Sequence, residues 1–414
     1  MTSTAIENVS TGLRRGSRLI TTEKTRGDSE SPSQDQVVSA QSNRRSVWVF
    51  FFVHGLCFSS WASRIPTIQA ELNLSATSLG TILFALPVGF FISLAFAGWL
   101  IAKVGSKGTV VMSSTLYSLS LVAIGLSTSA VQVASSLLFF GFFANLFNIS
   151  INTQAVAVEE LFQKRMMATF HGLWSLAGFA GAALGTWAIG QNISPFRHFL
   201  FVCLFVLVTI AVFNLHLIKK DKPVDKKSPF FAIPDKSLLA LGLIAFCSMM
   251  VEGAMFDWTG VYFSNVVQVN SELIGMGYTT FMIAMAGTRF LADGLAGRFG
   301  LKRILQTSGI LATIGLLIAV ALPHFVPSLF GFLLIGMGVS SVVPMVYSAA
   351  GKSKTMSAGM AITAVSSLGF MGFLIGPPLI GFIAGASSLR ISFLGLTLMS
   401  VCVVIAASRL RRES

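Results

Sequence analysis

Two carboxylates, Glu252 and Asp257, lie inside an otherwise apolar stretch of the chain. A carboxylate within a lipid bilayer is costly unless it is paired, hydrated or protonated, so such a group is a functional candidate. Glu252 falls near the middle of its apolar run, and no basic residue lies at a similar depth in that run. We therefore expect Glu252 to face a cavity or to hold a proton, as a proton-coupling group. The alternative is a structural carboxyl bonded to a neighbouring helix.

Asp257 lies five residues beyond Glu252, which places it about 140° around a helix and rules out a dyad on one face. Arg64 is expected at the matching depth in the first apolar run. An Arg64–Asp257 ion pair would form a gate that breaks when the site opens. Alternatively, Arg64 is a helix-end residue whose charged head reaches the membrane surface.

Three amides, Asn145, Asn148 and Asn152, are spaced three and four residues apart, which puts them on one helical face. An amide in lipid must find a partner, either a neighbouring helix or a polyhydroxylated ligand. We expect this face to line a path for a solute.

Aromatic and imidazole side chains complete a candidate binding site. Aromatic faces stack on sugar rings, and their polar tips donate hydrogen bonds. The alternatives are the aromatic belt at a membrane surface and, for a histidine, hydrogen-bonded packing. The candidates for substrate binding are His171, Trp174, Trp61 and Trp258, with His54 and Tyr262 as weaker ones.

Charged residues near the ends of apolar runs are expected to act as gates rather than as solute ligands. Arg289 and Asp293 are spaced i, i+4, and Arg298 follows them. The corresponding residues of the first half are Lys103 and Glu159.

The elements that must position these residues are membrane helices. The chain is 54% hydrophobic and 11% charged, whereas a soluble domain is about 25% charged. The apolar runs are continuous and near the ~20 residues that a spanning helix needs, which argues against a β-barrel. Twelve runs are expected, at about 46–68, 75–102, 108–127, 130–158, 168–190, 196–218, 238–264, 272–296, 301–321, 327–350, 355–383 and 389–408.

A polar segment, Lys219–Lys236, divides the runs into two halves. Its lysines, aspartates and prolines predict a solvated linker. The same offset relates Gly105 to Gly300 and Gly181 to Gly376, which favours internal duplication over chance. The expected parts are a disordered tail (1–45), a six-helix bundle (46–218), a linker (219–237), a second six-helix bundle (238–408) and a short tail (409–414).

The formal net charge of +13 reflects topology rather than binding to nucleic acid, because the basic residues gather on one side of the predicted helices. Cytoplasmic loops carry this excess, so both termini are expected in the cytoplasm, with membrane lipids as electrostatic partners. The four cysteines all lie in apolar runs and imply no disulfide framework. No nucleotide-binding loop, zinc cluster or catalytic elbow is present, so we expect neither an enzyme nor a cofactor.

The turn GWLIAKVGSKGTV from Gly98 and its counterpart DGLAGRFGLKRIL from Asp293 resemble the turn after the second helix of each half in the major facilitator superfamily. The segments SWASRIPTI, NTQAVAVE, FHGLWSLAG and EGAMFDWTGVYF resemble the branch related to fucose permease, which contains many uncharacterised bacterial inner-membrane proteins. The chain departs from these patterns at Ala102, Asn148 and Ala62, where carboxylates are usual. If proton coupling exists, Glu252 is the leading replacement.

The resemblance implies an all-α membrane protein of twelve helices in two halves that rock about a central site. The leading prediction is a monomeric inner-membrane symporter of a sugar-like or polyol-like solute, coupled to a proton or another ion. One alternative is a multidrug or metabolite efflux pump, although the usual GxxxGPxxGG signature is missing from the fifth run, where Ala182 stands. The other is a solute sensor that no longer transports.

Overall fold

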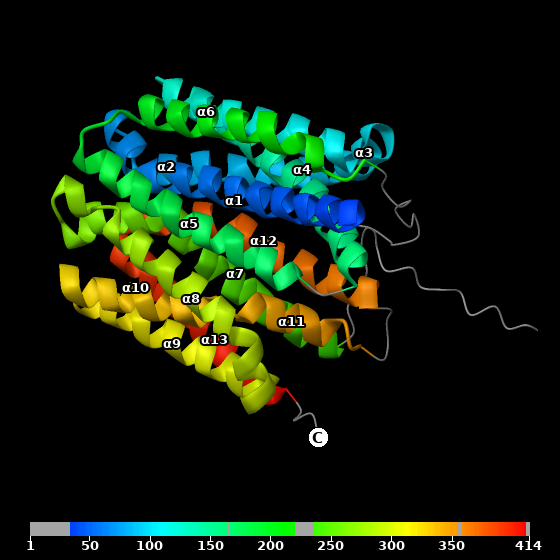
Figure 1. The fold of residues 1–414 in the computed structure, drawn as a ribbon. Helices are drawn as coiled ribbons and strands as arrows, with labels where there is room; N and C mark the ends of the chain where they lie inside the picture. The colour runs from blue at the N-terminus through cyan, green and yellow to red at the C-terminus, as the bar shows by residue number, and fades with distance from the viewer. Residues whose placement is uncertain (1–33, 164–165, 220–235, 354–357, 411–414) are drawn as a thin grey trace, which may run out of the picture.

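The computed structural model describes residues 34–163, 166–219, 236–353 and 358–410, and every regular element in these ranges is helical. Most of the two predicted tails (1–33 and 411–414) and most of the predicted linker (220–235) lie outside the described residues. The predicted disorder is wrong for residues 34–45, which form the start of the helix α1 (Gln34–Glu71). The described chain begins and ends at the same end of a bundle of long helices (Figure 1). We call this the terminal end and the opposite one the distal end.

The first half packs α1 against α5 and α3 against both α4 and α6. Helix α1 lies between α5 and α6, so both faces of its long apolar run are covered by protein (Figure 1). The elements are α1 (Gln34–Glu71), α2 (Ala76–Leu83), α3 (Ala85–Leu126), α4 (Ala130–Phe162), α5 (Met167–Gly190), α6 (Pro195–Phe213) and the short η1 (Asn214–His216).

The second half repeats this arrangement, with α7 against α12 and α9 against both α10 and α13. Helix α7 ends in a π-helical turn, η2, which leads to the distal loops. The elements are α7 (Lys236–Tyr262), η2 (Phe263–Val267), η3 (Ser271–Leu273), α8 (Met276–Phe299), α9 (Leu301–Ala321), α10 (Phe325–Val339), α11 (Val342–Ala350), α12 (Ala358–Ala386) and α13 (Leu389–Arg409).

Ten segments of the described chain are long and apolar enough to span a membrane. One of them, Ala76–Leu126, contains two of the predicted runs, and α8 supplies a further helix that carries three charged residues. The predicted all-α fold of twelve membrane helices in two halves is thus confirmed. Two runs are broken where a proline removes a helical donor, before Pro87 and before Pro344.

The predicted duplication has a counterpart in the backbone. Gly105 has φ 78° and ψ 161°, and Gly300 has φ 76° and ψ 156°. Side chains with a Cβ rarely adopt this conformation, so glycine is needed at both turns. Gly181 packs against α1, and Gly376 packs against α7, which is the helix equivalent to α1. The glycines that this sequence offset relates therefore occupy equivalent positions in the two halves.

The two halves meet along α2 with α12, α5 with α8, and α1 with α7. At the distal end glycines bring helices of the two halves close together. A Cβ built on Gly80 would lie 2.9 Å from the Cα of Gly381, and one built on Gly260 would lie 2.9 Å from Cγ of Pro66. The distal end is therefore closed by glycine-mediated contacts between the halves.

Candidate functional site

A cavity of about 240 Å³ lies between the two halves. Both halves contribute to its wall, with residues from α1, α3, α4 and α5 facing residues from α7, α8 and α12. The described residues that line it are His54, Phe58, Leu86, Pro87, Phe90, Phe91, Phe140, Ala144, Asn148, His171, Trp174, Met249, Glu252, Phe256, Arg289, Phe370 and Phe373.

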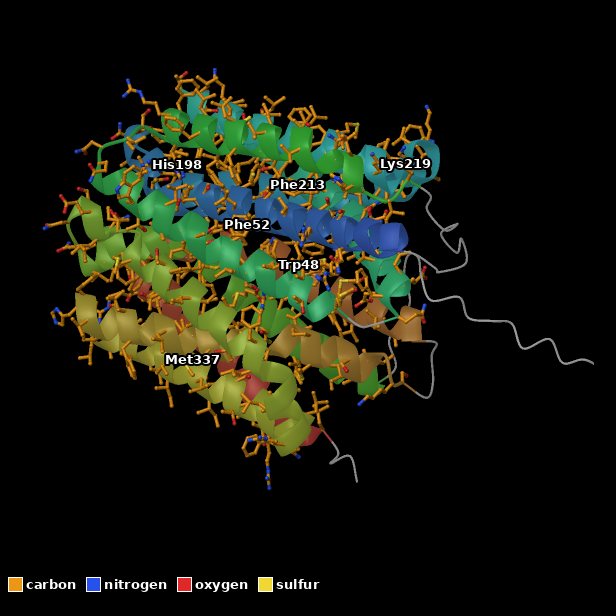
Figure 2. All side chains as sticks on the ribbon, viewed as in Figure 1. Trp48, Phe52, His198, Phe213, Lys219 and Met337 are labelled. Carbon is orange, nitrogen blue, oxygen red and sulfur yellow. The ribbon has the colours of Figure 1, made fainter. Side chains whose placement is uncertain are left out.

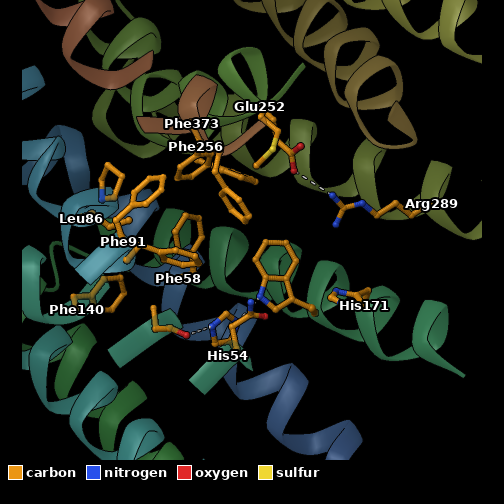
Figure 3. Close-up of a pocket in the computed structure, with 17 residues that line it drawn as sticks. His54, Phe58, Leu86, Phe91, Phe140, His171, Glu252, Phe256, Arg289 and Phe373 are labelled. Atoms are coloured by element: carbon orange, nitrogen blue, oxygen red, sulfur yellow. Dashed lines mark hydrogen bonds and ion pairs between the residues drawn. The ribbon is translucent and has the colours of Figure 1, made fainter. Parts of the chain in front are cut away.

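The cavity has an aromatic side and a polar side (Figure 3). Phenylalanines occupy the first, where the ring of Phe256 contacts those of Phe58 and Phe373 at centroid distances of 5.2 Å and 6.4 Å. Glu252, Arg289 and His171 occupy the second (Figure 3). An amphipathic wall of this kind fits a solute with a flat apolar body and polar groups at one edge.

Arg289 is the centre of the polar side. Its Nη2 donates to Oε1 of Glu252 at 3.1 Å, and its Nη1 donates to Oγ of Ser175 at 2.7 Å. Its Cζ lies 5.9 Å from the ring centroid of Trp174, which permits a cation–π contact. Because Ser175 and Trp174 belong to α5, Arg289 connects the second half to the first.

The third partner of Arg289 is a carbonyl that Pro344 leaves free. In a continuous helix the carbonyl of residue 340 would accept from the N–H of residue 344, but proline has none. The chain breaks between α10 and α11 at this point, and Nε of Arg289 donates to the Ser340 carbonyl at 3.3 Å. The helix break thus provides an anchor for the arginine.

Trp174 is held by His54. The indole Nε1 donates to Nδ1 of His54 at 2.7 Å, and Nε2 of His54 lies 3.1 Å from the Ala144 carbonyl. Indole nitrogen is only a donor and a carbonyl is only an acceptor, so His54 is neutral with its proton on Nε2. His54 therefore positions the Trp174 ring and is not free to exchange a proton without breaking this chain.

His171 lies beside Arg289 on the cavity wall and packs its ring edge-on against Phe51 at 5.3 Å. Its ring forms no hydrogen bond with the described residues, so it is available to a solute. Across the described ranges, no cluster of three His, Cys, Asp or Glu residues could hold a metal ion.

The predicted asparagine face is only partly on the cavity. Asn148 lines it, and its Oδ1 accepts from Nδ2 of Asn152 at 3.0 Å. Asn145 instead turns toward α3, where its Nδ2 donates to the Phe90 carbonyl and to Ser93 Oγ. The structure assigns Asn145 to helix packing, the alternative partner considered for these amides.

The predicted aromatic candidates divide in the same way. Trp174 lines the cavity, whereas Trp61 and Trp258 are fully buried away from its wall. Tyr262 is also buried, donates from its hydroxyl to the Ala319 carbonyl at 2.8 Å and stacks on Phe393, so it is not part of a surface belt.

The predicted Arg64–Asp257 ion pair is wrong for the conformation seen here. Nε of Arg64 donates to Nδ1 of His198 at 3.2 Å, and its Nη2 donates to the Ile193 carbonyl at 2.7 Å. His198 lies toward the distal end of α6 (Figure 2). The guanidinium is therefore satisfied within its own half. Asp257 is buried in α7, and no described residue forms an ion pair with it.

Arg289, predicted to belong to a gate, lines the cavity and pairs with Glu252 of α7. Its role in a gate stays a prediction. The side chain of Asp293 lies outside the description, and Arg298 is exposed at the end of α8. Glu159 caps α5 by accepting from the backbone N–H groups of Met166 and Met167. Lys103 lies over the Trp99 ring at 5.0 Å.

Sequence reasoning missed Ser175, Ser340 and the phenylalanines of the cavity. With 36 phenylalanines in the chain, no pattern distinguishes those that line a cavity from those that pack in the core. The Ser340 carbonyl did have a signal, namely a proline four residues later. Glu252 lines a cavity as predicted, and it also bonds to Arg289 of the helix α8, which is the alternative that was considered for it. This partner could not be read from the sequence of α7 alone.

The chain matches a known protein family over both of its halves. The model of the Major Facilitator Superfamily matches residues 47–354 and 238–414, which together cover both halves. The chain belongs to the major facilitator superfamily. It is thus a multi-pass membrane transporter by family.

Superfamily relatives share most of its length. An uncharacterized MFS-type transporter of Yersinia pestis is 30% identical over 92% of this chain and 98% of its own. Membrane protein MosC of Rhizobium meliloti is 29% identical over 86% and 87%. The crystal structure of the nucleoside transporter NupG has a TM-score of 0.70 at 13% identity, covering 89% of this chain and all of that one, which is a likeness of fold. These matches support the superfamily, and the fucose-permease branch remains a prediction.

Proposed function

We propose that this superfamily transporter binds a small, ring-shaped organic solute in the cavity between its halves and carries it by alternating access. Residues of both halves line the cavity, so a bound solute contacts both bodies that must move. The proposal rests on the observation that Arg289 faces the cavity and is hydrogen-bonded at the same time to α5, to α7 and to the break between α10 and α11.

Within the predicted class of sugar-like or polyol-like solutes, the residues that line the cavity favour ring-shaped solutes over open-chain ones. Aromatic faces stack on the apolar faces of rings. The charged pair and His171 lie on one side of the cavity, so an open-chain polyol would leave hydroxyls without partners along the aromatic side, which is costly in a buried site. A ring with its polar groups on one edge fits both sides.

Coupling is proposed to run through Glu252, as a symport with a proton. Glu252 is 11% exposed at its side chain and faces the cavity, where opening to water or arrival of a solute changes its surroundings. The excess of basic residues in one set of loops supports a cytoplasmic position for both termini. Location in the inner membrane and a monomeric state are further parts of the proposal.

The test is ligand-dependent stabilisation of the purified protein followed by counterflow in proteoliposomes. Phe256→Ala removes a ring from the centre of the cavity and should weaken binding and transport of any solute found. Phe139→Ala is the matched control, because that ring is 54% exposed on the outer surface of α4. Equal transport by the two variants would remove the cavity from the solute path.

The aromatic lining also favours the efflux alternative, since amphipathic compounds bind such walls. Right-side-out and inverted vesicles separate the two functions. Accumulation of the solute inside right-side-out vesicles supports import, and accumulation in inverted vesicles supports efflux. Binding of a solute without counterflow in either would support the sensor.

A further inference from the structure

Resting on the proposed function, we infer that the solute is a ring-bearing carboxylate that replaces Glu252 on Arg289, and that Glu252 then carries the accompanying proton. The solute's negative charge would thus enter the cavity together with one positive charge. The inference depends on how differently Arg289 and Glu252 are held.

Arg289 remains in place without Glu252. It also donates to Ser175 and to the Ser340 carbonyl, and it lies over Trp174. Glu252, in contrast, has Arg289 as its only hydrogen-bond or ion-pair partner among the described residues. The pair can therefore be opened by moving the carboxylate while the arginine stays fixed on the cavity wall.

The two ways of opening the pair differ in their electrostatic cost. A cationic solute bound to Glu252 would leave Arg289 unpaired, and a guanidinium cannot lose its proton to become neutral. An anionic solute bound to Arg289 would leave Glu252 unpaired, and one proton neutralises it. Because an unpaired buried charge is strongly unfavourable, the anion with a proton is the favoured ligand.

The charges balance in this exchange. The Arg289–Glu252 contact breaks, the solute carboxylate accepts hydrogen bonds from the Arg289 guanidinium, and Glu252 takes one proton at a carboxylate oxygen. The net charge of the cavity is the same before and after. The proton comes from the solvent on the side from which the solute enters.

The geometry of the contact supports the exchange. Glu252 makes a single hydrogen bond, from Nη2, although a guanidinium offers five N–H donors in a fork that can hold a carboxylate by two parallel bonds. A solute carboxylate can therefore make a better contact than Glu252 does. Its ring would extend toward Phe58 and Phe256 on the aromatic side.

The other titratable groups around Glu252 are few. Tyr347 of α11 interacts electrostatically with Glu252, and its hydroxyl contacts the Met249 sulfur. His171 of α5 interacts with Arg289, and His54 of α1 is locked to Trp174 and Ala144. The described part of α12 contributes no titratable side chain. Among the described residues, His171 is therefore the rival proton carrier on the cavity wall, and the buried carboxyl of Asp257, which does not line the cavity, is a second rival.

The experiment compares acids with their neutral amides. Benzoate, nicotinate and glucuronate are titrated into the purified protein against benzamide, nicotinamide and glucuronamide, with quenching of tryptophan fluorescence and the shift in Tm as readouts. At least one acid is expected to bind and its amide is not. The Kd of that acid should weaken about tenfold per pH unit where Glu252 is ionised in the free protein, because one proton is bound with each anion.

Variants of Arg289, Glu252 and His171 show which side chain binds the acid and which takes up the proton. Glu252→Gln should bind the acid at least as tightly with no pH dependence of Kd, whereas His171→Gln should keep the pH dependence. Arg289→Gln should lose acid binding, and Arg289→Lys, which keeps the charge without the fork, should weaken it by tenfold or more. The Tm of each variant without ligand shows whether it is folded.

The inference is overturned if amides bind as well as acids, if no acid binds, or if the pH dependence of Kd survives in Glu252→Gln. Counterflow of a neutral compound, with no acid binding, would overturn the inference and leave the proposed function standing. Failure of every acid and amide in both binding and counterflow would count against both.

Discussion

Adding one methyl group at Gly80 should open the distal end. A Cβ at this position would lie 2.9 Å from Gly381 Cα and 3.1 Å from the Pro377 carbonyl oxygen, whereas unstrained carbon atoms lie about 3.5–4.0 Å apart. Overpacking of this kind costs about 1–3 kcal/mol, and here only the state in which α2 touches α12 bears the cost. Gly80→Ala should therefore shift the equilibrium toward the distally open state by a factor of about 5 to 150.

Spin labels on cysteines at Glu71 and Ser387, both exposed at the distal end, would measure this shift as a change in their distance distribution. The native cysteines would first be replaced. Gly98→Ala is the control, because a Cβ there would meet nothing within 4 Å. A distance distribution for Gly80→Ala that matches the one for Gly98→Ala would refute the argument that backbone contact keeps the distal end closed.

Three further outcomes are expected. In a double-mutant cycle on the free energy of unfolding, Glu252→Gln and Arg289→Gln should show a coupling of about 2 kcal/mol or more, and additivity within about 0.5 kcal/mol would contradict their pairing. Gly141→Ala, whose Cβ would meet the Leu86 carbonyl, should lower thermal stability, whereas Gly395→Ala, with open space around its Cβ, should not. Asn148→Cys should react with a small hydrophilic thiol reagent and be protected by solute, and labelling no faster than that of Phe139→Cys would exclude Asn148 from the solute path.

The fold was largely predictable because membrane helices are specified by local composition. Long apolar runs and a repeated glycine turn do not depend on which helices become neighbours. Gly105 and Gly300 illustrate this, since their shared backbone conformation follows from a motif within a single loop. The helix breaks before Pro87 and Pro344 are consistent with the missing N–H of proline, whereas Pro66, Pro377 and Pro378 lie inside continuous helices.

The candidate site was only partly predictable because its contacts join different helices. Glu252 was recognised from its isolation in an apolar run, but its partner Arg289 lies on the next helix and was assigned to a gate. From the sequence, Arg64 could bond to a residue of either half. In the structure it donates to His198 and to the Ile193 carbonyl, which both belong to its own half. Pairing between helices depends on rotation and depth that spacing within one helix does not define.

Pro344 has an influence that extends beyond the bend in its own helix. By lacking an N–H, it leaves a carbonyl without a donor, and the nearest cation supplies one. An uncharged residue that is absent from the cavity wall thus helps to hold a positive charge in its place on that wall. Replacing this proline would restore the carbonyl to its helix, so the arginine would lose an anchor although no residue that touches the solute had changed.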